Sequence, residues 1–225
     1  MKNYAVAIDG PSGAGKSTLA QSMAKELNFV YVDTGAIYRT IGYYAWQKGI
    51  DPTKGEAVAG LLPELNISMT YGEDGLQKMY LNGQDVTEEI RLPEVSMYTS
   101  HVAAVPEVRS FLLDMQRDMA EKQSVIMDGR DIGTVVLPNA DVKIFLTASA
   151  EERAKRRFRE LKQRGSHKDY GVLLVEIEER DYKDSHRSIA PLKAAEDAVT
   201  IDTTDLTFEE SLAKLLETVR ERTGL

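Results

Sequence analysis

The chain has 225 residues, of which 42% are hydrophobic and 28% are charged, so it can bury a hydrophobic core. Because domains typically have about 150 residues, this length predicts one large domain, 1–225, with an insertion. Its formal net charge of −8 argues against broad, non-specific binding to nucleic acids. Cysteine is absent, which excludes disulfides, thiolate metal sites and a cysteine nucleophile.

Five short apolar runs, each followed by polar or glycine-rich residues, predict the strands of a buried sheet. In chain order they are Tyr4–Ile8, Phe29–Val32, Val125–Met127, Val142–Leu146 and Ala198–Ile201. Helical periodicity predicts helices at Lys16–Leu27, Val105–Lys122, Ala150–Arg164 and Phe208–Arg222. This alternation predicts an α/β fold: a doubly wound, five-stranded parallel sheet of the P-loop type with helices on both faces. Ligands bind such sheets at the carboxyl ends of the strands, where the polar residues fall.

A hairpin interrupts the alternation. Asn66–Tyr71 and Lys78–Leu81 flank a turn of glycine and acidic residues, Gly72–Gly75. We therefore expect a small β-containing insert at about residues 61–95.

The segment from Ala150 to Arg164 is strongly basic although the chain is acidic. We predict that residues 151–170 form a basic helical lid, which closes over a triphosphate and excludes water. The alternative is an exposed helix with ion pairs between neighbouring turns, such as Glu152 with Arg156.

Residues 10–17 match the pattern G-x-x-x-x-G-K-[ST] between a predicted strand and a predicted helix. Glycines let successive backbone N–H groups point at one anion, and the helix N-terminus adds positive charge. We expect the donor nucleotide to be held by Gly10, Pro11, Ser12, Gly13, Ala14, Gly15, Lys16, Ser17 and Thr18. Lys16 can reach the β- and γ-phosphates, and the Ser17 hydroxyl can bind Mg²⁺. ATP or GTP binding follows.

Arginines beside predicted strand ends and in a later charge-dense stretch indicate a second phosphate site. They are Arg39, Arg130, Arg180 and Arg187. A guanidinium group matches a phosphate with two parallel hydrogen bonds and stays charged. Ordinary alternatives remain open, namely a solvated helix position for Arg39, a structural ion pair for Arg130 and an exposed charged face for the other two.

Taken together, these segments resemble the bacterial cytidylate kinase family of nucleoside monophosphate kinases nearly end to end. The resemblance is carried by IDGPSGAGKST, DTGAIYR, VAAVPEVR, DGRDIGT, VKIFLTAS, EERAKRR and ERDYKDSHRSIAPL. Many proteins share the phosphate loop, whereas the combination of DTGAIYR, DGRD and R-x-x-x-D-x-x-R is far more specific. The resemblance implies phosphorylation of CMP and dCMP to CDP and dCDP in pyrimidine metabolism, with ATP and Mg²⁺ as cofactors.

The same resemblance implies roles for individual residues. It gives the acceptor phosphate to Arg39, Arg130 and Arg187, the cytosine edge to Ser100, Arg109 and Asp131, and the sugar hydroxyls to Arg180 and Asp184. Thr34 is expected in the substrate site as well, and it keeps the hydroxyl of the serine that is common there. The base contacts suit cytosine, because Asp131 and Ser100 can accept from the exocyclic amine while Arg109 donates to N3 and O2.

The expected catalysis is positioning and charge neutralisation by Lys16, Arg130 and Arg187, since an acceptor phosphate is already anionic. Among the lid arginines, Arg157 is the expected contact to ATP. Two alternatives stay open: an alcohol kinase of the shikimate type, with Asp33 or Asp131 as base, and a nucleotide-dependent switch. No apolar stretch approaches the roughly 20 residues of a membrane span. We expect a cytoplasmic monomer that binds neither nucleic acid nor membrane.

Overall fold

The computed structural model describes residues 2–73, 75–163, 165 and 167–225. Asp74 of the predicted hairpin turn, and Arg164 and Ser166 of the predicted lid, lie outside the described residues. The described residues form two compact units. Unit 1 comprises 1–29 and 124–225, and unit 2 comprises 30–123.

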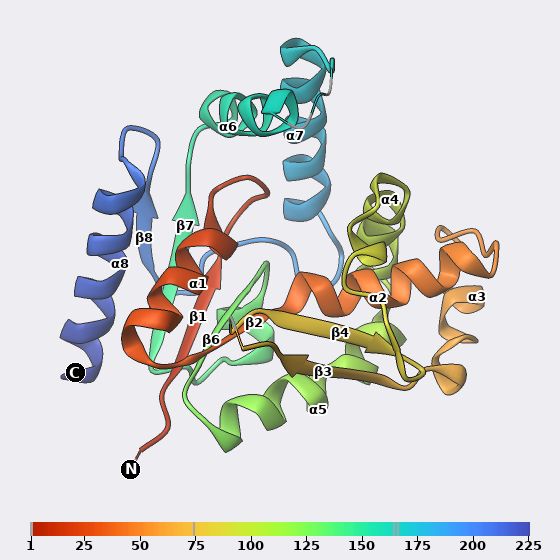
Figure 1. The fold of residues 1–225 in the computed structure, drawn as a ribbon, viewed down its shortest axis with the longest axis horizontal. Helices are drawn as coiled ribbons and strands as arrows, with labels where there is room; N and C mark the ends of the chain where they lie inside the picture. Colours follow the sequence, from red (N-terminus) through yellow and green to blue (C-terminus); the bar gives the residue numbers. More distant parts are fainter. Residues whose placement is uncertain (1, 74, 164, 166) are drawn as a thin grey trace. The chain divides into compact units, whose positions relative to one another are not determined.

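The main sheet has five strands in the order β2-β6-β1-β7-β8 (Figure 1). They are β1 (Ala5–Asp9), β2 (Val30–Asp33), β6 (Val125–Gly129), β7 (Val142–Thr147) and β8 (Val199–Asp202). β1 pairs in parallel with β6 and β7, and β7 pairs in parallel with β8. Val6, Ala7 and Ile8 are fully buried, because β1 is covered on both faces. The predicted α/β fold with a parallel sheet is confirmed.

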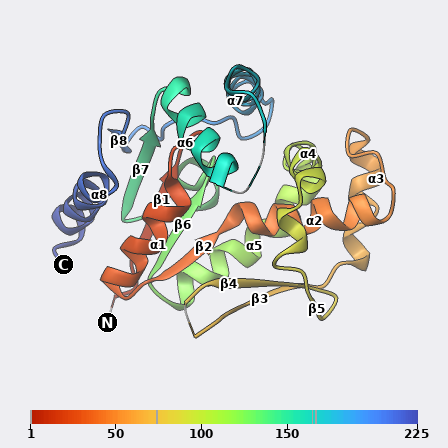
Figure 2. The same ribbon diagram turned by 45° about the horizontal axis from the view of Figure 1, so that its top comes forward.

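Eight α-helices are described, and several match the predicted ranges closely. They are α1 (Lys16–Leu27), α2 (Thr34–Gln47), α3 (Gly55–Ala59), α4 (Pro93–Val102), α5 (Pro106–Lys122), α6 (Ala150–Gln163), α7 (Tyr170–Ser185) and α8 (Phe208–Thr223). Short helical turns lie at η1 (Leu62–Glu64), η2 (Glu89–Arg91) and η3 (Ile132–Val136), the last with π-type geometry. Figure 2 shows α6 and α7 side by side, as Figure 1 does.

The sequence analysis did not predict α2, α3, α4 and α7. In α2, residues on all sides are buried, so the amphipathic stripe that marks a surface helix is missing. In α7 only Leu173 and Asp184 are buried, so the apolar stripe is too thin to reveal a helix. Hydrophobic periodicity therefore did not reveal α2 because too many of its residues are buried, and it did not reveal α7 because too few are.

Unit 2 holds a second, three-stranded antiparallel sheet in the order β3-β4-β5. Its strands are β3 (Ile67–Tyr71), β4 (Gln77–Leu81) and β5 (Gln84–Asp85), with Met69 opposite Met79. The predicted hairpin is confirmed, and β5 extends it by one short strand. This sheet is the β-containing insert in the α/β fold.

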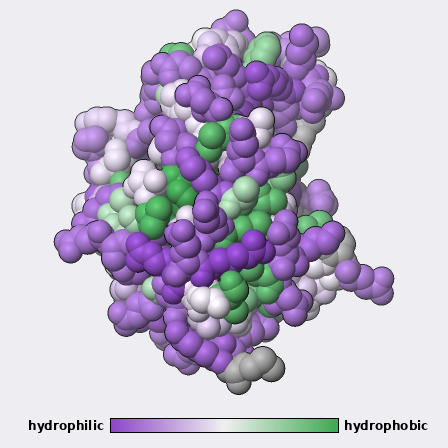
Figure 3. All heavy atoms as spheres, turned by 90° about the vertical axis from the view of Figure 1, so that its left-hand side faces the viewer, coloured by the Kyte–Doolittle hydropathy of each residue, from purple (hydrophilic) through white to green (hydrophobic). Residues whose placement is uncertain are grey.

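In unit 1, α1 and α8 pack against each other and against the sheet. α8 starts at a capping box in which the Thr207 and Glu210 side chains bond each other's backbone N–H, and it buries Leu215 and Val219. The side of the molecule on which α8 lies in Figure 1 carries mostly hydrophilic side chains, with small hydrophobic patches between them (Figure 3). Among the described residues, no helix is long and apolar enough to cross a membrane.

Candidate active site

The phosphate loop joins β1 to α1 in a conformation that requires glycine. Gly10, Gly13 and Gly15 have φ values of 151°, 79° and 87°. A Cβ atom on Gly10 would lie 1.9 Å from the backbone oxygen of Leu146, so no other residue fits there. Helix α1 then begins at Lys16, which leaves the first N–H groups of the helix available to an anion.

Lys16 lies inside this loop and is 6% exposed. Its Nζ donates a hydrogen bond to the Pro11 backbone oxygen at 2.7 Å. Burial lowers the pKa of Lys16 well below its usual value, and the charge of Arg130 lowers it further. A phosphate group beside Lys16 would offset this cost, because an opposite charge favours the ammonium form.

Ser17 follows Lys16 and faces the end of β6. Its hydroxyl donates to Asp128 Oδ2 at 2.8 Å, and Asp128 is 4% exposed. A hydroxyl and a carboxylate from these two places in the fold are the ligands with which P-loop proteins hold Mg²⁺. The sequence analysis assigned Ser17 to the metal and missed Asp128, although the aspartate after a buried strand was its signal.

Asp184 organises the arginines of unit 1. It is 1% exposed, it accepts from Arg130 Nε at 2.9 Å, and it accepts from Arg187 Nη2 as well. Burial alone would raise the pKa of Asp184, but the charges of Arg130, Arg187 and Arg180 outweigh it and lower the pKa. Arg130 and Arg180 also act on Lys16. The structure thus brings Lys16, Arg130, Arg180, Asp184 and Arg187 into one electrostatic cluster.

A second group of candidate residues lies in unit 2, at the start of α2. The Asp33 side chain caps the helix by accepting from Ala36 N at 2.8 Å, and it accepts from Arg39 Nη2 at 2.6 Å. Gln77 of β4 accepts from Asp33 N at 2.9 Å, which ties the small sheet to this cap. Thr34 is buried as the first residue of α2. Arg39 is thereby held by a fixed carboxylate.

Arg109 lies on α5 in unit 2 and is 9% exposed. Its Nη1 donates to the Ala103 backbone oxygen at 3.1 Å, and its guanidinium lies over the Tyr38 ring, 5.7 Å from the ring centre. The hydrogen bond and this cation–π contact both restrain the guanidinium group. Ser100 is half-buried on α4.

The arginines of α6 differ in their surroundings. Arg153 is 4% exposed and donates to the Ser12 backbone oxygen of the phosphate loop and to both carboxylate oxygens of Asp181. Arg156 donates to the Thr203 backbone oxygen at 2.7 Å and pairs with Glu152. Arg157 pairs with Glu160 and has a half-exposed side chain. Arg153 is therefore hydrogen-bonded to the phosphate loop, a role the sequence analysis missed, and Arg156 Nη1 also lies beside this loop, 4.0 Å from where a Cβ atom on Gly15 would be.

Two predicted positions need correction. Arg39 was expected beside a strand end but lies within α2, and the charge-dense stretch that holds Arg180 proves to be the helix α7. The turn-like residues Asp33 and Gly35 cap and open α2 rather than form a loop. Arg130 and Arg187 do follow the ends of β6 and α7.

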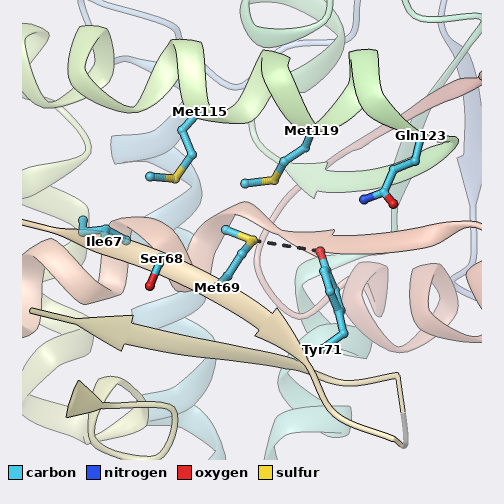
Figure 4. A pocket seen from close by; sticks show the side chains of 7 residues that line it. All are labelled: Ile67, Ser68, Met69, Tyr71, Met115, Met119 and Gln123. Atoms are coloured by element: carbon cyan, nitrogen blue, oxygen red, sulfur yellow. Dashed lines mark hydrogen bonds between the residues drawn. The ribbon is translucent and has the colours of Figure 1, made fainter. Parts of the chain in front are cut away.

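A pocket of about 300 Å³ lies in unit 2 between β3 and α5 (Figure 4). It is lined by Ile67, Ser68, Met69, Tyr71, Met115, Met119 and Gln123. The Tyr71 hydroxyl points to the Met69 sulfur at 3.9 Å, and burial raises the pKa of Tyr71 to about 12. None of the candidate residues lines this pocket, so it is separate from the phosphate chemistry.

Comparison with known proteins decides the family. The family model described as cytidylate kinase matches residues 6–221. The chain belongs to the cytidylate kinase family. It is 52% identical over 217 residues to the cytidylate kinase of Caldicellulosiruptor bescii, which covers 96% of each chain. It is 50% identical to the cytidylate kinases of Flavobacterium johnsoniae and Bacillus licheniformis, with 98% of each chain covered.

Among solved structures, an uncharacterized protein from Eubacterium ventriosum superimposes with a TM-score of 0.52 at 14% identity, covering 98% of this chain and 99% of the other. This likeness concerns the fold alone. The predicted resemblance to the cytidylate kinase family is confirmed, and with it the assignment to a kinase that uses ATP.

Proposed function

We propose that this protein transfers the γ-phosphoryl group of ATP to CMP and dCMP, which yields ADP with CDP or dCDP. The observation that carries the proposal is the cluster formed by the phosphate-loop Lys16 with Arg130, Arg180 and Arg187 around Asp184. To bind the phosphates of a single nucleotide, a protein needs only the phosphate loop and its lysine. Further arginines beside it suit a second phosphorylated ligand.

The attacking atom is an oxygen of the CMP phosphate, which is anionic at neutral pH and needs no general base. Lys16, Arg130 and Arg187 neutralise the charge that develops on the transferring group. An alcohol acceptor would need a free carboxylate as base. Asp33, one candidate for that base, is already engaged by Ala36 N and Arg39, which disfavours the alcohol kinase.

Several of the proposed substrate contacts lie in unit 2. In unit 2, Arg39 and Thr34 serve the acceptor phosphate and its surroundings, while Ser100 and Arg109 read the cytosine edge. The cation–π contact of Arg109 with Tyr38 supports this role, because a restrained guanidinium group discriminates between base edges.

In unit 1, we assign the buried Asp131 to the base of the substrate. Arg130 and Arg187 are the proposed contacts of the acceptor phosphate in this unit, and Arg180 and Asp184 serve the sugar. The pairing of Asp184 with two of these arginines supports a preorganised site, since the guanidinium groups are oriented before the substrate arrives.

The donor is ATP, cradled by residues 10–18. We propose that the Ser17 hydroxyl and the Asp128 carboxylate would hold Mg²⁺, which would supply positive charge against the phosphates of the donor. We further propose that residues 151–170 act as the lid. Within it, Arg153 fixes the lid base to the phosphate loop and Arg157 contacts the donor.

The test is ADP release at fixed ATP and Mg²⁺, with CMP, dCMP, UMP, AMP, GMP, dTMP and shikimate offered singly. Fast turnover with CMP and dCMP, and much slower turnover with UMP and the purines, is expected. Turnover with another monophosphate alone would overturn the roles of Ser100, Arg109 and Asp131. Equal ADP release without an acceptor would identify a nucleotide hydrolase or switch instead. We also propose that the protein acts in the cytoplasm, in pyrimidine metabolism, and that it is a monomer. Sedimentation of the same preparation tests the monomeric state.

A further inference from the structure

Asp9 is a buried carboxylate that the proposed chemistry does not use. It is the last residue of β1, directly before the phosphate loop, and it is 4% exposed. Its Oδ1 accepts from Ile132 N and its Oδ2 accepts from Gly133 N, both at 2.7 Å. Both oxygens are therefore engaged by the backbone of a segment more than 120 residues away in sequence.

The two N–H groups open the turn η3, which directly follows Arg130 and Asp131. Asp131 precedes this turn without capping it through its own side chain. The first N–H groups of a helical turn have no partner within the turn, so Asp9 supplies from β1 the acceptors that they need. A Cβ on Gly133 would lie 3.4 Å from Asp9 Oδ2 and 3.2 Å from Lys143 Cδ, which leaves little room for a side chain.

This arrangement carries an electrostatic cost. Burial raises the pKa of Asp9 to about 6, and the nearby charge of Asp131 raises it too, whereas the two backbone N–H groups and Lys16 lower it. A negative charge next to a phosphate site also disfavours anionic ligands. Both oxygens of the Asp9 carboxylate accept hydrogen bonds from the backbone of η3. Its main contribution is therefore structural, because it connects β1 to this turn.

We propose that Asp9 is a positioning residue that fixes Arg130 and Asp131 for the acceptor by holding the amides of Ile132 and Gly133. The inference rests on the proposed function, because it takes Arg130 and Asp131 as acceptor contacts. Asp9 connects the beginning of the donor loop to the beginning of the acceptor turn. Loss of this connection should disturb the acceptor more than the donor.

The first variant is Asp9→Asn, which keeps the size of the side chain. Its amide offers one acceptor oxygen, so at most one of the two hydrogen bonds survives, and its NH₂ group faces a backbone N–H. Loss of a charge-assisted hydrogen bond predicts that kcat/KM for CMP falls about 10- to 100-fold. KM for ATP should stay within about threefold, since the loop that holds ATP keeps its own glycine geometry.

Asp141→Asn is the matched control. Asp141 Oδ2 accepts from Ala5 N at 2.9 Å, so it also joins a carboxylate to the backbone of β1, but at the opposite end of the strand. This variant should leave kcat/KM for CMP and KM for ATP unchanged. If the two variants gave the same loss, or if Asp9→Asn affected ATP and CMP alike, Asp9 would be a general structural residue and the proposal would be wrong.

Amide hydrogen exchange of the nucleotide-free protein gives a readout that does not depend on the reaction. Ile132 and Gly133 should exchange about 10- to 100-fold faster in Asp9→Asn than in the wild type or in Asp141→Asn. Unchanged protection of both amides would overturn the proposed link. Wild-type protein that does not phosphorylate CMP would refute the proposed function instead, so the two failures are distinguishable.

If Asp9→Asn does not fold, Gly133→Ala tests the same contact from the other side. Its methyl group would lie 3.2 Å from Cδ of Lys143, which is mostly buried and paired with Asp197, and 3.4 Å from Asp9 Oδ2, so the packing around this contact must adjust. The expected result is a lower kcat/KM for CMP with KM for ATP maintained. Wild-type values for both substrates in this variant would contradict the proposal.

Discussion

At the scale of single residues, the candidate active site combines buried charges that stabilise one another. Asp184 is almost fully buried, yet Arg130 and Arg187 each donate a hydrogen bond to it. The hydrogen bond shown for Lys16 goes to a backbone oxygen, that of Pro11, while the carboxylates Asp128 and Asp9 act on it through their charge. The protein itself therefore orients the arginines. A bound phosphate would stabilise the charged form of the buried Lys16 side chain.

The substitution Arg130→Met tests the catalytic role of this arginine. Removing one preorganised donor to the transferring group should lower kcat with CMP by about 10²- to 10³-fold. Steady-state kinetics with ATP and CMP measure this, and Lys122→Met, at an exposed position paired with Asp118, is the control. A loss of only a few-fold would remove Arg130 from the catalytic set.

Asp184→Asn tests the stability of the cluster and its dependence on pH. It leaves Arg130 and Arg187 without their shared carboxylate, which should cost about 3 kcal/mol of unfolding free energy at pH 7. The pKa of Asp184 is lowered below its ordinary 3.8 in the fold. Its stabilisation is therefore complete above that value and disappears as the pH falls through the folded pKa.

Urea unfolding of the wild type and Asp184→Asn at pH 7, 5 and 3 measures this difference. The gap between the two proteins should be the same at pH 7 and 5 and smaller at pH 3. A gap that widens on acidification would contradict the sign of the pKa shift.

At the scale of elements, the phosphate loop is set by steric limits. Gly10→Ala would bring a methyl group to 1.9 Å from the backbone of β7, at a φ of 151°. Gly49→Ala provides the control, because Gly49 has a φ of 66° and no atom within 4 Å of the added methyl. We expect Gly49→Ala to cost about 1 kcal/mol and Gly10→Ala to cost more and to abolish ATP binding. Thermal unfolding and nucleotide titration measure both, and equal costs would contradict the steric explanation.

The helices α6 and α7 are joined to the phosphate loop through Arg153. The substitution Arg153→Met removes the contacts of this side chain with Asp181 and Ser12. It should lower the free energy of unfolding by about 3 kcal/mol. This is the low end of the range for breaking a buried ion pair, because Asp181 is partly exposed. Arg157→Met removes a surface pair and should change stability by less than about 1 kcal/mol. Urea unfolding compares the two, and a larger loss for Arg157→Met would contradict the placement of these side chains.

At the scale of the whole molecule, net charge determines what the surface attracts. The chain carries −8 overall, and the basic residues of α6 are accompanied by acidic neighbours such as Glu152 and Glu160. We expect no binding to duplex DNA tighter than the range of about 10⁻⁴–10⁻⁶ M that is typical of non-specific contacts at physiological salt. Fluorescence anisotropy with a labelled duplex, repeated at low salt, measures this. Submicromolar binding at physiological salt would contradict the prediction.

The sequence by itself determined the features that depend on local rules. The phosphate loop follows from the spacing of Gly10, Gly15, Lys16 and Ser17, because a turn of glycines before a helix needs no distant contact to be recognised. The strands follow from short apolar runs, because a doubly covered parallel sheet has no polar face. The resemblance to the cytidylate kinase family followed from several such segments read together, and the comparisons confirmed it.

Only the tertiary structure decided how distant residues meet. Asp9 holds Ile132 and Gly133, Asp184 holds Arg130, and Arg153 reaches Ser12 across more than 50 residues of sequence in each case. No local pattern encodes these pairs, because packing of the sheet and helices brings their backbones together. The helix α2 escaped prediction for the same reason, since burial on all its sides comes from its neighbours and erases the periodicity that local rules use.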